Sequence, residues 1–148
     1  MARTAVAYRA TGAGTTTLPS TSIYSLGTGD CWLVEVGVTN TTVTAYELSL
    51  ARLTSAGTQG ASAGTITYEE GSANLTAKWA AVQAHTGTAP TLGPEVRRTS
   101  VGASIGSGII FTFGGRGLLL PSGTANGLAL IAVTGTGQIA DVYWSVDQ

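Results

Sequence analysis

The chain has 148 residues, a formal net charge of −1 and 10% charged residues, against about 25% in typical globular domains. This length fits one domain and leaves no room for a second of full size, and the scattered basic residues form no stripe for nucleic acid. A single cysteine, Cys31, excludes an intrachain disulfide framework and a zinc site made of several cysteines.

The first 19 residues predict an extended N-terminal arm. They are small, polar and rich in Gly and Thr, with Arg3, Tyr8 and Arg9 as large side chains. Such a segment buries too little to fold alone, so it is either disordered or ordered by lying on a partner, in which case Arg3, Tyr8 and Arg9 are the contact residues. No apolar run has the length of a signal peptide or a membrane span, so we expect a soluble, unprocessed chain with no membrane partner.

Residues 31–53 predict an antiparallel hairpin. Apolar side chains recur there at every second position: Trp32, Val34, Val36 and Val38. This alternation is typical of a strand with one buried face. The stretch TNTT then favours a turn, and Leu48 and Leu50 resume the alternation.

One short helix is predicted near residues 73–86, after a short strand at TITYEE. Ser72 can cap its start and Gly87 can end it. Apolar residues recur between them at helical spacing: Leu75, Trp79 and Val82. We expect this helix to lie against the sheets.

The C-terminal third predicts further strands. Runs bounded by Gly, Pro or Asn follow one another at roughly ten-residue spacing, as EVRRTSVGAS, GIIFTFG, GLLLPSG, GLALIAVTG and QIADVYWSVDQ. This rhythm is typical of an all-β sandwich or barrel. From this part of the chain we expect four further core residues: Phe111, Phe113, Leu130 and Trp144.

The glycine-rich stretch VGASIGSGIIFTFGGRGLLLPSG raises the alternative of a phosphate-binding loop in which Arg116 grips the anion. Such loops lead from a strand into a helix whose N-terminus faces the phosphate. Here the apolar run ends at Pro121 and no helical pattern follows. We therefore interpret the glycines as corners between strands and expect no nucleotide or other cofactor.

Candidate catalytic residues do not form a recognisable set. His85 is the only histidine, and a triad with Asp30, Asp141 or Asp147 lacks the G-x-S-x-G elbow around a serine. Glu69–Glu70 would point to opposite faces of a strand. We expect His85 to be a structural residue near the end of the helix, and we expect no catalytic, cofactor or metal site and no enzyme.

Three tryptophans offer one further alternative, a platform on which sugars stack. Trp32, Trp79 and Trp144 each lie in register with an apolar face, so core packing is the expectation for them.

Three stretches resemble the small jelly-roll decoration (cement) proteins of tailed-bacteriophage capsids: MARTAVAYRATGAGTTT, WLVEVGVTNTTVTAYELSLARLT and GIIFTFGGRGLLLPSGTANGLALIAVTGTGQIADVYWSV. The resemblance implies a homotrimer on the outside of the shell that clamps neighbouring capsomers. A charge-poor surface fits such association, because contact with other copies would cover it. Similar runs occur in phage fibre heads and in trimeric jelly rolls of the tumour-necrosis-factor type.

The expected fold is therefore all-β: an antiparallel jelly-roll sandwich of about eight strands in residues 20–148, with one short helix and an extended N-terminal arm in residues 1–19. The expected function is that of a virion protein on the capsid exterior, made in the host cytoplasm, with itself and the major capsid protein as partners. The alternative is a fibre head or a receptor- or carbohydrate-binding trimeric domain.

Overall fold

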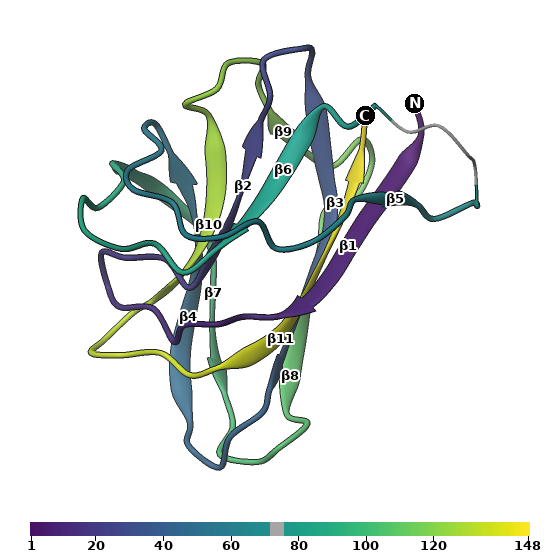
Figure 1. Cartoon of the computed structure of the whole chain (residues 1–148). Helices are drawn as coiled ribbons and strands as arrows, with labels where there is room; N and C mark the ends of the chain where they lie inside the picture. The colour runs from purple at the N-terminus through teal and green to yellow at the C-terminus, as the bar shows by residue number, and fades with distance from the viewer. Residues whose placement is uncertain (72–75) are drawn as a thin grey trace.

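The computed structural model, which describes residues 1–71 and 76–148, is a sandwich of two antiparallel sheets (Figure 1). One sheet contains, in spatial order, β5 (Thr67–Tyr68), β1 (Arg3–Arg9), β11 (Ala140–Asp147), β3 (Cys31–Asn40) and β8 (Gly108–Thr112), and β9 (Leu118–Leu120) shares the β3 edge with β8. The other contains β6 (Trp79–Gln83), β2 (Thr21–Ser25), β10 (Gly127–Ala132), β4 (Tyr46–Leu53) and β7 (Leu92–Val101). The predicted β-sandwich is thus confirmed, although the described residues form eleven strands rather than about eight.

Strands pair in a nested order along the chain. β1 pairs with β11, β2 with β10, β3 with β8 and β9, and β4 with β7, in each case antiparallel. β3 and β4 lie in different sheets, so the predicted hairpin of residues 31–53 is wrong: the turn after β3 crosses from one sheet to the other. β5 and β6 lie between β4 and β7 in the sequence, yet each extends one sheet at the side of β1 and β2. The two termini consequently lie together at the top of Figure 1, where the Ala2 amide donates to the Gln148 carbonyl at 3.0 Å.

The core lies between the sheets and consists of side chains from both inner faces. Its largest fully buried members include Trp79, Trp144, Leu33, Leu50 and Leu128. Eight of the ten residues expected in the core are buried: Val36, Val38, Leu48, Leu50, Phe111, Phe113, Leu130 and Trp144.

The two exceptions, Trp32 and Val34, are only half-buried, and the sequence-based expectation for them is wrong. Leu33 is fully buried in their place. Two adjacent residues of β11 pair with Leu33 and Glu35, which leaves Val34 as an extra residue in β3. Such a bulge reverses the alternation of the strand, so positions before it point to the opposite face from that predicted.

The helix predicted near residues 73–86 is also wrong, because Trp79–Gln83 form strand β6. Residues 72–75 of that prediction lie outside the described part of the chain. β6 pairs with all five residues of β2, whose edge would otherwise be unpaired, and Trp79 enters the core with no exposed surface. These hydrogen bonds and this burial outweigh a helical pattern that consists of three apolar residues over about two turns, since a short helix is marginal by itself. In residues 1–71 and 76–148, no helix is long and apolar enough to cross a membrane.

The prediction of an extended N-terminal arm is corrected as well, since residues 3–9 form β1 inside the six-stranded sheet. All seven pair with β11, and Thr4 and Val6 point inward and are buried. The segment has too little apolar surface to fold alone, but it needs little when a neighbouring strand supplies the hydrogen-bond partners.

The outer face of the five-stranded sheet is covered by the chain's own loops. Parts of the segments 54–66 and 84–91 lie over it, and the Tyr24 hydroxyl donates to the Ala56 carbonyl at 3.2 Å, whereas Ala63 pairs with β6 and packs in the core. A second apolar cluster forms beneath them: Tyr24, Ala51, Leu53, Val82, Ala129 and Ile131. A Cβ at Gly60 would lie 2.0 Å from the Gln83 carbonyl oxygen, so this cover requires glycine there.

Candidate functional site

The three predicted contact residues lie on β1 and have partners within the chain. Arg3 and Arg9 point outward, and each guanidinium makes two hydrogen bonds to an aspartate of β11. The Nε–Oδ1 distances are 2.5 Å from Arg3 to Asp147 and 2.7 Å from Arg9 to Asp141. Hydrogen bonding raises the pKa of Arg3 and lowers the pKa of Asp141.

Tyr8 points toward the core instead. Its hydroxyl accepts a hydrogen bond from Trp144 Nε1 at 2.8 Å and is also bonded to Thr21. Burial raises the pKa of Tyr8 to about 12, so the phenol stays neutral under all ordinary conditions. The side chain therefore links the two sheets, and its polar atom is used inside the molecule.

The sequence contains a signal for these ion pairs that our sequence analysis missed. Arg3 and Arg9 are six residues apart, and so are Asp141 and Asp147. In an antiparallel pair, equal spacings of opposite charge meet end to end on one face. The two arginines thus indicate the register of β1 on β11.

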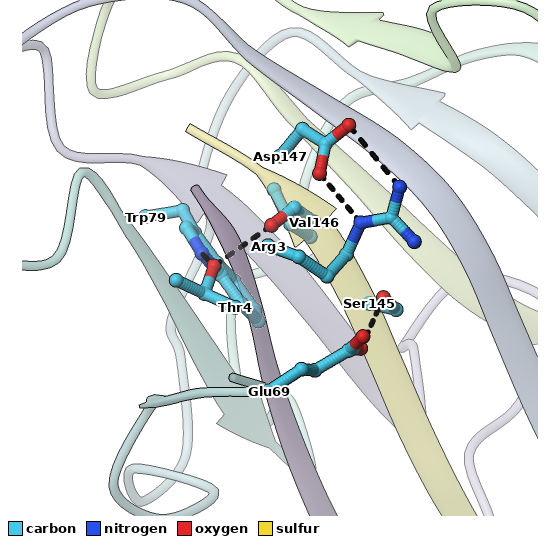
Figure 2. Close-up of polar contacts among 7 residues, drawn as sticks. All are labelled: Arg3, Thr4, Glu69, Trp79, Ser145, Val146 and Asp147. Carbon is cyan, nitrogen blue, oxygen red and sulfur yellow. Dashed lines mark hydrogen bonds and ion pairs between the residues drawn. The ribbon is translucent and has the colours of Figure 1, made fainter. Parts of the chain in front are cut away.

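A group of polar side chains joins β1, β6, β11 and the residue after β5 (Figure 2). Trp79 Nε1 donates to Thr4 Oγ1 at 2.9 Å, and Thr4 Oγ1 donates to the Val146 carbonyl at 2.8 Å. On the outer face, Ser145 Oγ donates to Glu69 Oε1 at 2.5 Å. These residues come from four separate parts of the sequence, so no local pattern brings them together.

Glu35 lies on the same outer face, directly across from Ser145, and accepts a hydrogen bond from Tyr143. Burial and the Glu35 carboxylate together raise the pKa of Tyr143 to about 12. The Tyr143 ring covers Gly37, where an added Cβ would lie 2.0 Å from it. Glu35, Glu69 and Arg3 therefore all have hydrogen-bond partners within the chain.

His85 and Ser22 form a buried pair beneath the covering loops. Ser22 Oγ lies 2.7 Å from His85 Nε2, and the exposed fractions are 0% for Ser22 and 5% for His85. Among the described residues, Nδ1 of His85 has no hydrogen-bond partner. The pair therefore lacks both the aspartate of a triad and access for a substrate, and burial lowers the pKa of His85.

We expect His85 to make stability depend on pH in a window above the carboxylate range. Because its folded-state pKa is below the unfolded value of about 6.5, the unfolded chain binds the proton more readily, and the free energy of unfolding falls as pH drops through that value. Urea denaturation midpoints at pH 7.5 and 5.5 measure this fall. His85→Gln should reduce it, and an equal fall in the variant would contradict the assignment.

The loops at one end of the sandwich contain no ionisable side chain, and we name this set of loops the uncharged end. It consists of four loops, each of which connects one sheet to the other: residues 10–20, 41–45, 102–107 and 133–139. The β3–β4 and β7–β8 loops meet at the bottom of Figure 1.

Hydrogen bonds join these four loops to one another. Asn40, which is fully buried, donates from Nδ2 to the carbonyls of Thr44 and Gly102, both at 2.9 Å. Thr41 Oγ1 donates to the Ile139 carbonyl at 2.7 Å, and the Gly137 amide donates to the Gly14 carbonyl at 3.0 Å. The uncharged end is therefore a connected surface with a defined shape.

Apolar side chains project from this surface. Val43 and Ile105, at the tips of two joined loops, have exposed fractions of 72% and 71%. Outside these loops, on the outer face of the adjoining sheet, Ile110 of β8 is 56% exposed and lines a shallow hollow of about 260 Å³ beside Gly106 and Tyr143. An arrangement of this kind can contribute apolar area to an interface without burying charge.

In the part of the chain that the structure describes, no three His, Cys, Asp or Glu side chains are grouped so that they could hold a metal ion.

Comparison with protein-family models and with curated proteins found no match to this chain.

Proposed function

We propose that the chain is a structural virion protein that binds the outer surface of a tailed-phage capsid as a homotrimer and stabilises contacts between capsomers. We also propose that its sandwich is a jelly roll. In that fold, one long hairpin rolls up, so the first strand pairs with the last and the inner strands pair in nested order. The pairing of β1 with β11, β2 with β10, β3 with β8 and β9, and β4 with β7 supports this assignment.

The observation that carries the proposal is the uncharged end. Around a rotation axis, identical residues of different copies meet, so a charged residue near the axis would face its own copies and repel them. Burying four loops without ionisable groups avoids both this repulsion and the desolvation of charges. We therefore assign the trimer contact to this end, with Val43 and Ile105 as its apolar contacts.

A trimer joined in this way leaves the opposite end of each protomer free. In our proposal that end meets the major capsid protein on the capsid exterior, and the chain is made in the host cytoplasm. The intrachain partners of Arg3, Tyr8 and Arg9 favour this end over the N-terminal segment as the clamp.

The second candidate is a carbohydrate- or receptor-binding trimer such as a fibre head. It is favoured by one observation, the outward position of Trp32 and Tyr143 on the uncovered face of the six-stranded sheet. However, Arg116 lies over the Trp32 ring at 4.8 Å and Tyr143 lies over Gly37, so neither ring is an open stacking surface. A glycan array should therefore be blank.

The association surface is tested by the double variant Val43→Asp, Ile105→Asp. We expect light scattering to give the wild type three times the 14.9 kDa mass of one chain. The variant should be monomeric, because each interface would then contain several facing carboxylates.

The matched control is Leu26→Asp, Thr28→Asp, which exchanges an exposed leucine and adds two charges in the β2–β3 loop at the other end. This control should remain trimeric. A monomeric wild type, or equal loss of association in both variants, would contradict the assignment of the trimer contact. Co-sedimentation of the wild type with undecorated capsid shells tests the capsid partner separately.

A further inference from the structure

A cavity of about 300 Å³ lies at the end of the sandwich opposite the uncharged end. Its wall contains Leu53, Pro94, Leu119 and Pro121, with Thr54 and Asn126 as polar neighbours, and Arg52 is the charged residue in it. Arg52 follows the inward positions Leu48 and Leu50 of β4, and its Nη1 donates to the Leu119 carbonyl of β9 in the other sheet. The guanidinium thus lies between the two sheets where the core opens.

Arg52 differs from the other five arginines in its partners. Three of them form ion pairs, namely Arg3, Arg9 and Arg98, and two lie over aromatic rings, namely Arg97 on Phe113 and Arg116 on Trp32. Within residues 1–71 and 76–148, no carboxylate pairs with Arg52, and the remaining four residues, Ser-Ala-Asn-Leu, include no acid. In the described structure its Nε and Nη2 donors have no hydrogen-bond partner.

We propose that this cavity is a binding site for a carboxylate, with Arg52 as the ion-pair partner. A guanidinium presents two parallel N–H groups that match the two oxygens of a carboxylate. The apolar wall of leucine and proline excludes water from one side, which strengthens such a pair relative to one on an open surface. The size of the cavity, at the lower limit for ligand pockets, suits one small group rather than a cofactor.

The carboxylate can come from an aspartate or glutamate of a partner protein or from a free small acid, and both use the same chemistry. Partial burial lowers the pKa of Arg52, because removal from water disfavours the charged guanidinium. The site does not depend on the proposed trimer, because no residue of the uncharged end contributes to it.

The test is an NMR titration of the ¹⁵N-labelled chain with acetate, and with acetamide as the neutral analogue of equal shape. We expect saturable shifts at the amides of Arg52, Thr54 and Asn126 with acetate and none with acetamide. Arg52→Met should weaken binding by at least about tenfold, whereas Arg98→Met removes an exposed paired arginine and should leave it unchanged. A blocked Ala-Asp-Ala peptide, compared with Ala-Asn-Ala, distinguishes a protein source from a free acid by its tighter binding.

If the role of Arg52 is only to close the end of the core, acetate and acetamide will shift the same amide signals equally, and Arg52→Met will lower the free energy of unfolding. That result would overturn the proposal. Arg52→Lys keeps the charge and most of the stem, so it remains informative if the methionine variant fails to fold. Binding by Arg52→Lys should be weaker than in the wild type but still selective for acetate over acetamide. Loss of that selectivity in the folded lysine variant, or full affinity in Arg52→Met, would also overturn the proposal.

Discussion

Deletion of residues 2–9 is expected to abolish the cooperative unfolding transition. The deletion removes β1, so all seven of its pairs with β11 are lost and the core loses Thr4 and Val6. The net stability of a domain is only about 5–15 kcal/mol, and an unpaired inner strand next to an open core removes a comparable amount. Thermal melts followed by circular dichroism, together with light scattering for aggregation, measure the effect.

The matched control keeps the strand and removes only its charged side chains. Arg3→Ala, Arg9→Ala should fold and melt close to the wild type, because ion pairs that remain accessible to water contribute little to stability: the Arg9 pair is exposed and the Arg3 pair is partly buried. If the deleted chain melts as cooperatively as the wild type, β1 is dispensable and residues 1–19 act as the arm that the sequence first indicated.

The second large effect is expected for Trp144→Ala. Trp144 has no exposed surface, packs in the core and donates to the Tyr8 hydroxyl. Truncation of a buried tryptophan costs about 3–5 kcal/mol, which lowers the melting temperature of a chain of this size by roughly 10 °C. Urea denaturation gives the free energy and calorimetry the melting temperature.

Trp32→Ala makes a matched comparison, because sequence alternation alone places Trp32 in the core as well. In the structure the bulge at Val34 turns Trp32 outward beneath Arg116. We expect a cost of roughly 1 kcal/mol or less, as for a surface residue with one cation–π contact. Similar costs for Trp32→Ala and Trp144→Ala would show that the bulge is absent in solution.

The trimer contact and the carboxylate site are proposed at opposite ends of the sandwich. The uncharged end offers apolar loop tips for other copies of the chain, while the opposite end offers the Arg52 guanidinium in the wall of a cavity. The variants proposed for each end leave the other end intact. Their results can therefore be interpreted independently.

The sequence shows the segments that form the uncharged end, but only the fold shows that they lie together. The four loops of the uncharged end are visible as stretches without ionisable residues. Their assembly into one surface depends on Asn40, which joins the β3–β4 and β7–β8 loops through bonds to residues 4 and 62 positions away. The partners of Arg52 and His85 likewise depend on contacts between strands that are distant in the chain.

The sequence by itself determined the all-β class and most of the core, because alternation and corner residues are local consequences of backbone geometry. The tertiary structure alone decided four features: that residues 3–9 belong to a sheet, that Trp79–Gln83 extend another, that β3 and β4 lie in different sheets, and that β3 reverses its faces at Val34. Each depends on a neighbouring strand with unpaired backbone groups. Hydrogen bonds to those backbone groups contribute more free energy than the weak conformational preference of a short segment. The sequence of that segment does not reveal which strand will be its neighbour.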